Sequence, residues 1–399
     1  MSAEIIPPAP HPDRATVHAE YLVIGGGIAG ASVASWLAPH GRVIILERES
    51  QPGYHSTGRS AALFMESYGT PQVRALTMAS RAFFESPPPS FTDYPLFSPR
   101  GALIVAGPTQ ASLLEHHWDV LRSVTTKATR LNPRQTLALM PVLREEHVLG
   151  AVLEPDASDI DVHAIHQGYL RRSRRGGGLL VCNADVQAIE RVGEHWRISA
   201  GGTTYEAPIV LNAAGAWVDQ IAKLAGVEPL GIEPRRRSAF IFAPPNDIDI
   251  SRWPMTIGAG EDWYVKPDAG MLLGSPANAD PVSPQDVQPE EMDIALAIAR
   301  IEEVTTLTIR RPTRTWAGLR SFVADGDLVA GFDDQAAGFF WIAAQGGYGI
   351  QTSPAMGETC AALARGLGVP EHAASFGVTA DMLSPARLRV RSPMMANSQ

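Results

Sequence analysis

Short apolar runs separated by segments with helical spacing organise the first part of this chain. The run 21–24 is apolar and rich in branched side chains, and a second run of the same kind covers 43–46. The alanine-rich segment between them has helical spacing through Leu37. Runs of about four apolar residues are typical of strands that are buried on both faces of a parallel sheet. The pattern therefore predicts a strand–helix–strand unit and an α/β fold.

The rest of the chain alternates between helical and strand patterns, and its second half is richer in strands. One helix is expected to end at Phe84, and the region 108–143 is expected to form helices interrupted by turns. Further helices are expected from about 159–161 through Tyr169, over 289–303 and after 352. Strands are expected at 96–106, 179–183, 186–200, 203–207, 209–212, 238–242, 263–267, 271–275, 305–310, 316–322, 328–332 and 339–344.

Three glycines and one acidic residue occupy defined positions in the first unit. Gly25, Gly27 and Gly30 follow the first strand, and Glu47 ends the second. In this spacing the first glycine allows a tight turn, the second lets the backbone approach a pyrophosphate, and the third lets helix and strand pack closely. Free N–H groups at the helix start bind the pyrophosphate, and the acidic residue accepts hydrogen bonds from a ribose. The pattern predicts an adenine dinucleotide, and leaves NAD and FAD open.

Segments outside this unit favour FAD over NAD. The hydroxyl-rich stretch 56–62 leads into a helix and the break 87–89, whereas an NAD domain usually continues with another β/α unit. The strand at 209–212 delivers small residues that let backbone pass close to a cofactor. The glycine-rich segment 345–352 precedes a late helix, whose N–H groups suit negative charge on a reduced flavin. Both ends of the chain are thus expected to build one cofactor site.

Composition and charge limit the function classes. The 399 residues are 45% apolar and 19% charged, with a formal net charge of −9, which argues against nucleic acid as a partner. The only cysteines, Cys182 and Cys360, cannot form a disulfide framework or a CxxC metal or redox site, so we expect no metal and a reducing, cytoplasmic location. No apolar run approaches the length of a membrane span.

Seven segments carry a resemblance to a known family. They begin with YLVIGGGIAGAS at 21–32, end with AAQGGYGIQT at 343–352, and include 46–62, 68–76, 236–245, 264–282 and 315–332. On these segments the sequence resembles the D-amino-acid oxidase superfamily of FAD-dependent amine oxidoreductases, and within it the D-arginine dehydrogenase group. The resemblance implies non-covalent FAD and oxidation of a D-amino acid to an imino acid, which hydrolyses to a 2-oxo acid and ammonia. A quinone or another acceptor is expected to reoxidise the flavin.

The predicted elements and the resemblance together indicate an α/β (α+β) architecture, in which a Rossmann-like FAD-binding domain contains an inserted antiparallel-sheet substrate domain. The FAD-binding domain is expected to be discontinuous, and disordered or loose segments are expected at both ends. The expected boundaries are 1–18 for the lead-in, 19–97, 150–232 and 317–388 for the FAD-binding domain, 98–149 and 233–316 for the substrate domain, and 389–399 for the tail.

The resemblance also suggests catalytic residues. Arg237 and Arg320 match the arginines that bind the substrate carboxylate, and a planar guanidinium binds a carboxylate bidentately. Tyr68 and Tyr264 match tyrosines that close over the substrate, and Gly347 matches the residue whose carbonyl holds the substrate amine. The residues expected to contact FAD are Gly25, Gly27, Ile28, Ala29, Gly30, Glu47, Arg48, Ser56, Thr57, Ser60, Ala61, Ala62, Val186, Ala213, Gly215, Trp217, Gly346, Tyr348, Gly349, Ile350, Gln351 and Thr352.

Three positions depart from the D-arginine dehydrogenase pattern. This chain has Ala102 where the group has the glutamate that grips the substrate guanidinium, Leu63 in place of a histidine, and Met65 in place of a threonine. A guanidinium buried without its carboxylate partner loses several kcal/mol of binding. D-arginine is therefore expected to be a poor substrate, and an apolar D-amino acid such as D-leucine, D-methionine or D-phenylalanine a better one. The expected neighbours of the substrate side chain are Leu63, Phe64, Met65, Ala102, Met255 and Ile257.

Three histidines are assigned to other places, and two further functions stay open. His55 lies on the loop expected to face FAD, whereas His163 and His166 are expected to face solvent on a helix far from the site. One alternative keeps the fold and changes the substrate to an N-methyl amino acid or a 2-hydroxy acid, since paired arginines bind any carboxylate. The other is a catalytically weak flavin-binding subunit of a larger amine-oxidising assembly.

Overall fold

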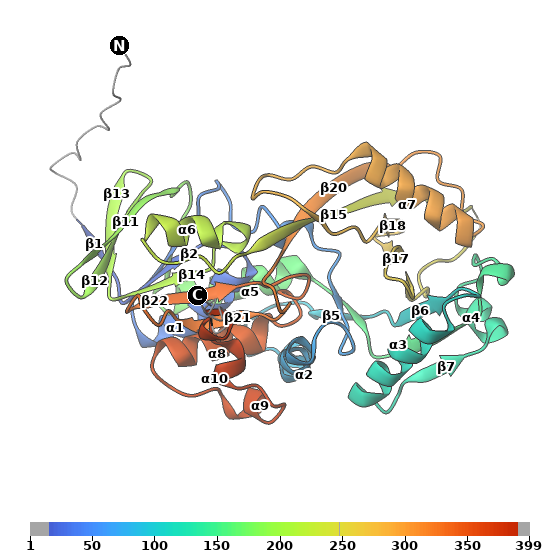
Figure 1. Ribbon diagram of the computed structural model, residues 1–399, viewed down its shortest axis with the longest axis horizontal. Helices are drawn as coiled ribbons and strands as arrows, with labels where there is room; N and C mark the ends of the chain where they lie inside the picture. Colours follow the sequence, from blue (N-terminus) through green and yellow to red (C-terminus); the bar gives the residue numbers. More distant parts are fainter. Residues whose placement is uncertain (1–15, 247, 390–399) are drawn as a thin grey trace, which may run out of the picture.

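A computed structural model describes residues 16–246 and 248–389. Within these residues the chain forms two lobes, one around a mostly parallel sheet and one around a mostly antiparallel sheet (Figure 1). The predicted mixed α/β architecture is thereby confirmed. The lead-in predicted over 1–18 and the tail predicted over 389–399 lie almost entirely outside the described residues.

The first lobe is organised by the parallel sheet that contains the glycine motif. All its neighbouring strands are parallel except the last pair. Alternate residues of the strand 21–24 belong to different hydrophobic cores, because successive side chains of a strand point to opposite faces of the sheet. The strand order is β10 (Leu179–Val181), β3 (Val43–Leu46), β2 (Tyr21–Ile24), β14 (Ile209–Asn212), β22 (Phe339–Ala343) and β21 (Val329–Phe332).

Helices and a small sheet cover the two faces of the parallel sheet. On one face lie α1 (Ile28–Leu37), α5 (Val162–Arg175) and α8 (Ser353–Ala364), with α2 (Pro71–Glu85) beside α8. On the other lie α6 (Val218–Leu224) and a sheet of β1 (Val17–His18), β13 (Thr203–Ala207), β12 (His195–Ala200) and β11 (Val186–Val192). Three short helices close this lobe: α9 (Glu371–Ala374), α10 (Ala380–Leu383) and α11 (Ala386–Arg389).

The second lobe is organised by the larger, mostly antiparallel sheet. Its strand order is β19 (Asp280–Pro281), β15 (Glu233–Phe242), β18 (Met271–Ser275), β17 (Tyr264–Asp268), β16 (Met255–Gly258), β6 (Ala102–Ala106), β8 (Gly150–Glu154) and β7 (Thr129–Leu131), and β20 (Arg314–Phe322) pairs with β15. Around it lie α3 (Ala111–Val124), α4 (Pro133–Leu139) and α7 (Glu291–Val304). A three-stranded sheet of β4 (Leu63–Phe64), β9 (Ser158–Ile160) and β5 (Phe97–Pro99) lies between the lobes.

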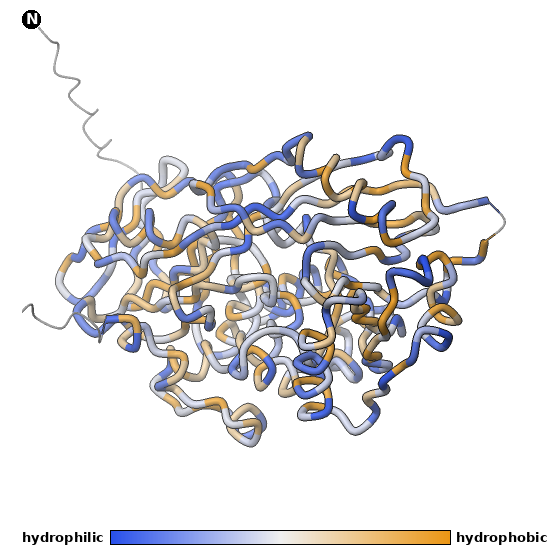
Figure 2. The backbone as a smooth tube through the Cα atoms, turned by 45° about the vertical axis from the view of Figure 1, so that its right-hand side comes forward, coloured by the Kyte–Doolittle hydropathy of each residue, from blue (hydrophilic) through white to orange (hydrophobic). Residues whose placement is uncertain are grey.

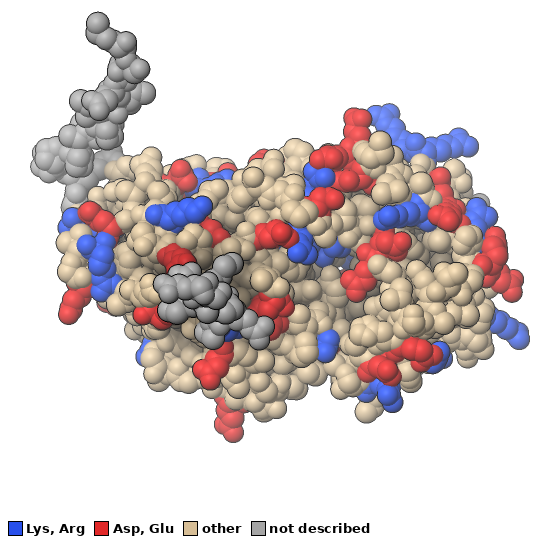
Figure 3. Space-filling view, in the orientation of Figure 1, with Lys and Arg blue, Asp and Glu red and all other residues tan. Residues whose placement is uncertain are grey.

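Hydrophobic segments alternate with hydrophilic ones along the chain, and the outermost loops of the second lobe are largely hydrophilic (Figure 2). Basic and acidic side chains are interspersed on the face shown in Figure 3, without a large area of one sign. The domain boundaries stay a proposal. The proposed boundaries place the segments that form β8 and most of β20 in the FAD-binding domain, whereas both strands pair within the antiparallel sheet.

Three expected elements differ from the structure. The expected strand at 305–310 is irregular apart from one bridge between Thr305 and Leu143, because the Ile309 amide donates to the Glu302 carboxylate and not to a strand. The expected helical region 108–143 contains the strand β7. The expected single strand at 186–200 is a hairpin of β11 and β12, which turns at Gly193, where φ is +60°.

Candidate active site

The start of α1 depends on glycine because no side chain has room there. Gly25 has φ of +104°, and a Cβ on it would lie 2.6 Å from the Ala213 carbonyl oxygen. A Cβ on Gly30 would lie 1.9 Å from the Gly25 carbonyl oxygen. The N-terminus of α1 is thus held close to β2 and β14, and its positive end lies where an anion would bind.

A cavity of about 330 Å³ lies beside this turn. Glu47 is 8% exposed at its wall, and its carboxylate accepts hydrogen bonds from the amides of Gly26 (2.8 Å) and Glu49 (2.9 Å). The Trp217 ring contacts both the Arg48 guanidinium, 4.2 Å from its centroid, and the His55 ring, whose centroid is 4.6 Å away. The cavity is lined by Ile24, Gly25, Gly27, Leu46, Glu47, Arg48, Gly53, Tyr54, His55, Ser56, Thr57, Ala184, Asp185, Val186, Ala213, Ala214, Gly215, Ala216, Trp217, Gln220, Ile221 and Leu224.

His166 corrects one expectation. It was expected to face solvent far from the cofactor motif, but it is 4% exposed and its Nε2 lies 2.9 Å from the Gly26 carbonyl oxygen. It reaches that turn because α5 packs against α1. Burial lowers the pKa of His166, so its neutral form is favoured and donates this hydrogen bond. His163, one turn earlier, is exposed as expected.

A second cavity, of about 460 Å³, lies between the two lobes and shares Ser56 and Thr57 with the first. Thr57 Oγ1 accepts the Ile28 amide at 3.0 Å, so the shared wall lies at the start of α1. Ser56 Oγ donates to the Leu319 carbonyl at 2.6 Å, which ties this loop to β20. The two cavities therefore meet at the helix N-terminus, an arrangement that suits an extended dinucleotide whose phosphates lie at the junction.

Arg237 and Arg320 project into the second cavity from neighbouring strands. Arg237 on β15 lies opposite Gly318 of β20, and Arg320 is two residues further along β20, so both side chains leave the same face of the sheet. Arg237 Nε donates to the Asn278 carbonyl at 2.6 Å. Among the described residues, no carboxylate forms an ion pair with either guanidinium. Burial and the nearby Arg320 charge lower the pKa of Arg237, and a substrate carboxylate would offset this repulsion.

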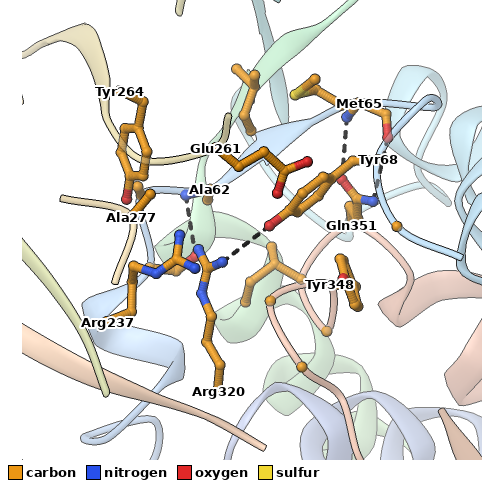
Figure 4. Close-up of a pocket in the computed structure, with 18 of the residues that line it drawn as sticks. Ala62, Met65, Tyr68, Arg237, Glu261, Tyr264, Ala277, Arg320, Tyr348 and Gln351 are labelled. Carbon is orange, nitrogen blue, oxygen red and sulfur yellow. Dashed lines mark hydrogen bonds between the residues drawn. The ribbon is translucent and has the colours of Figure 1, made fainter. Parts of the chain in front are cut away.

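Tyrosine rings and a glycine surround the arginine pair. The Tyr68 hydroxyl accepts a hydrogen bond from Arg320 Nη1 at 3.1 Å, and the Tyr68 ring meets the Tyr348 ring edge-on at 5.0 Å (Figure 4). Tyr264 is buried in the same wall. A Cβ on Gly347 would lie 2.8 Å from Arg320 Nη1, so only glycine leaves the guanidinium its place. The structure brings all five predicted catalytic residues to this cavity.

The expected side-chain pocket is brought together only in part. Leu63, Met65, Met255 and Ile257 line the second cavity. Ala102 does not: it is 1% exposed and packs behind Met65 in a small apolar cluster.

Phe64 is a further correction. Successive residues of β4 point to opposite faces, so Leu63 lines the cavity while Phe64 is buried against Phe84 and Phe97.

The expected FAD contacts divide in a similar way. Most of them line one of the two cavities, whereas Ala29, Gly30 and Thr352 lie behind the walls. The Gln351 side chain bonds both backbone groups of Met65, at 3.2 and 3.4 Å, so it supports the cavity wall. The cavity is lined by Ile28, Ser56, Thr57, Arg59, Ser60, Ala61, Ala62, Leu63, Met65, Ser67, Tyr68, Gly69, Thr70, Arg74, Ile104, His116, His117, Val120, Arg237, Ala239, Met255, Ile257, Glu261, Tyr264, Ala277, Gly318, Leu319, Arg320 and 345–351.

Residues 20–363 match the family described as DAO, FAD dependent oxidoreductase. The chain belongs to this family. It is therefore an FAD-dependent oxidoreductase, and the choice of FAD over NAD is confirmed. Residues of the two cavities fit FAD: the glycine turn leaves room for phosphates. The small residues Ala61, Ala62, Gly346, Gly347 and Gly349 leave room for a flat ring in the second cavity.

The chain is similar to several known proteins of this fold. It is 25% identical over 405 residues to FAD-dependent oxidoreductase domain-containing protein 1 of Bos taurus, covering 88% of this chain and 81% of that protein. It is 25% identical over 242 residues to L-2-hydroxyglutarate dehydrogenase of Escherichia coli, covering 57% of this chain and 55% of that protein. Glycine oxidase from Geobacillus kaustophilus superposes with a TM-score of 0.78 at 20% identity, over 88% of this chain and 96% of that structure.

Polar residues that the sequence reasoning missed lie at the cavity wall. Glu261 reaches in from the side opposite the two arginines, from a turn where its φ is +51°, and His116 and His117 of α3 lie nearby (Figure 4 shows Glu261). The left-handed position of a glutamate is unusual and has no local sequence signal. Among the described residues, no cluster of side chains could hold a metal, and no helix is long and apolar enough to cross a membrane.

Proposed function

We propose that this protein oxidises D-amino acids with apolar side chains in an FAD-dependent oxidative deamination. The observation that carries the proposal is the arginine pair of the second cavity, which has no carboxylate partner within residues 16–246 and 248–389. Two adjacent half-buried guanidiniums repel each other, and an anion would offset this repulsion, so a carboxylated ligand suits this wall. The D configuration rests on the resemblance of the seven segments between 21 and 352, and not on the cavity's shape.

The chain's residues would act by positioning. FAD, when bound, supplies the acceptor for the hydride that leaves the substrate α-carbon. Arg237 and Arg320 would bind the carboxylate, and the Gly347 carbonyl would accept a hydrogen bond from the amine. Tyr68 and Tyr264 would exclude water from the reacting carbon, because both line the cavity beside the arginines. The imino acid product would then hydrolyse to a 2-oxo acid and ammonia, and a quinone or another acceptor would reoxidise the flavin.

The apolar side-chain preference is supported by the neighbouring wall. Leu63, Met65, Met255 and Ile257 present hydrocarbon and thioether groups, so an aliphatic or aromatic substituent would replace water there without losing hydrogen bonds. Among the described residues that line this cavity, Glu261 is the single carboxylate. It lies opposite the arginines, where it would face a cationic group at the far end of a substrate side chain (Figure 4).

A second candidate is oxidation of a 2-hydroxy acid or an N-methyl amino acid at the same arginine pair. The match to a relative named L-2-hydroxyglutarate dehydrogenase covers 57% of this chain, and this similarity supports a hydroxy acid as the alternative substrate. The arginines would bind its carboxylate equally well.

Anaerobic stopped-flow mixing of the oxidised protein with separate substrates tests both candidates. The panel contains D- and L-leucine, D-arginine, an N-methyl amino acid and a 2-hydroxy acid, and the signal is the visible absorption of oxidised flavin. Bleaching by D-leucine and not by L-leucine would support the proposal. Bleaching only by the hydroxy acid or the N-methyl compound would replace it with the second candidate, and no bleaching by any of them would contradict both.

A further inference from the structure

Glu154, at the end of β8, holds a buried carboxylate beneath the wall of the second cavity. Its side chain is 3% exposed. One carboxylate oxygen accepts the Glu66 amide at 2.7 Å, and the other accepts the Ser67 hydroxyl at 2.5 Å. Both donors belong to one turn of the chain, so the carboxylate binds two successive residues at once.

No cation offsets this carboxylate among the described residues. The neighbouring Glu66 side chain is itself paired with Arg81 at 2.6 Å, and adds negative charge beside Glu154. Burial raises the pKa of Glu154, which shows that its environment is costly for the charged form. A buried acid whose hydrogen bonds all come from one turn, with no cation beside it among the described residues, costs stability, so its contribution is better sought in the position of that turn.

The turn that Glu154 binds presents Tyr68 to the arginine pair. Tyr68 directly follows Ser67, and its hydroxyl accepts the hydrogen bond from Arg320. On the other side of the turn, the Gln351 side chain holds both backbone groups of Met65. Glu154 comes from the antiparallel sheet and Gln351 from the segment before α8, so the turn is fixed between the two lobes.

We propose that Glu154 is a positioning residue that acts through Glu66 and Ser67 to hold Tyr68 against Arg320. It thereby sets the geometry in which the arginine pair receives a carboxylate. The inference rests on the proposed function only in taking a carboxylate as the ligand, and it does not depend on which group is oxidised.

The first test measures hydrogen exchange of the segment 64–69 in the FAD-loaded protein. In Glu154→Ala, the Glu66 amide loses its acceptor, and we expect its exchange to become about tenfold faster. Glu154→Gln keeps an oxygen for that amide and an NH₂ group for the Ser67 hydroxyl, so exchange should stay within about twofold of the wild type. Asp333→Ala, which removes a buried carboxylate that accepts the amides of Gln335 and Ala336 elsewhere, should leave 64–69 unchanged. Equal exchange in Glu154→Ala and the wild type would overturn the proposal.

The second test is a double-mutant cycle on carboxylate binding. Benzoate has no transferable hydride, and its binding is followed through the flavin absorption. Glu154→Ala should weaken benzoate about tenfold in the wild-type background and change it by less than about twofold in the Tyr68→Phe background, since the effect passes through the tyrosine hydroxyl. Equal effects in both backgrounds would contradict the proposal.

The two tests separate this inference from the proposed function. If no amino acid bleaches the flavin but the exchange and benzoate results are as expected, the role of Glu154 stands and the assigned reaction falls. If D-leucine is oxidised and the cycle is additive, the reaction stands and the role of Glu154 falls. Should Glu154→Ala fail to fold, Ser67→Ala removes one of the two hydrogen bonds, and the same cycle with Tyr68→Phe decides the matter.

Discussion

The two cavities differ in the atoms that form their walls. The smaller one has a backbone turn in its wall: an added methyl group at Gly25 would collide with the Ala213 carbonyl oxygen, and Gly30 packs behind this turn with equally little room. The larger one is shaped by long side chains, with Arg237 and Arg320 opposite Glu261 and Tyr68 between. A wall made of backbone serves one ligand and tolerates little change, whereas a wall made of side chains can change its ligand while the fold is kept. The expected consequence is that substitutions in the first cavity remove the cofactor and those in the second change the substrate.

The largest effect is expected from Gly25→Ala. The new Cβ would lie 2.6 Å from the Ala213 carbonyl in a backbone with φ of +104°, so the turn that faces the pyrophosphate must move. We expect protein that purifies without flavin, measured as the ratio of flavin to protein absorbance. Gly177→Ala is the matched control, since φ there is +90° but nothing lies within 4 Å. Full flavin content in Gly25→Ala would show that the backbone wall is less strict than its contacts indicate.

Arg320→Ala tests the side-chain wall. Loss of a charge-assisted bidentate contact costs about 3 kcal/mol, so we expect KM to rise about 100-fold for every carboxylated substrate while the flavin stays bound. Arg314→Ala, on the same strand and exposed, is the control and should leave KM unchanged. An unchanged KM in Arg320→Ala would remove this residue from the site.

A smaller, selective effect is expected when polarity is returned to the side-chain pocket. Ala102→Glu should raise kcat/KM for D-arginine relative to D-leucine, with Leu63→His as an added change. Met65 separates Ala102 from the cavity, and Glu154 lies opposite Ala102 on the neighbouring strand, so we expect Met65→Thr to be needed as well. In the combined variant, the ratio of kcat/KM for D-arginine to that for D-leucine should rise about tenfold. Met65→Thr alone is the control. A ratio that does not move in the combined variant would contradict the assignment of this pocket.

The smallest effect concerns stability near the cofactor turn. Burial lowers the folded-state pKa of His166, so the unfolded chain binds a proton that the folded chain rejects as pH falls below about 6.5. The wild type should therefore lose stability on acidification by up to about 1.4 kcal/mol per pH unit more than His166→Gln. Urea unfolding at a series of pH values from about 6.5 downward measures this loss of stability. His163→Gln, exposed on the same helix, should follow the wild type; parallel curves for wild type and His166→Gln would contradict the assignment.

Much of the fold could be predicted because its signals are local. The run 21–24, the glycines that follow it and the run 43–46 are neighbours in sequence and in space, so spacing alone predicts the turn and the helix. Where the sequence reasoning was wrong, the deciding partner was distant. Leu307 and Ile309 are buried after α7, and the pattern predicts a strand there, but the Ile309 amide is taken by a side chain.

The sequence by itself determined the dinucleotide turn, the choice of FAD and the residues that approach the second cavity, because those depend on residue type at short spacing or on resemblance of whole segments. Only the tertiary structure decided that His166 supports the glycine turn, that Ala102 lies behind Met65, and that Glu154 binds the turn before Tyr68. Each of these contacts joins elements from separate parts of the chain. The packing of these elements in three dimensions determines the contacts, and no local pattern of residues encodes that packing.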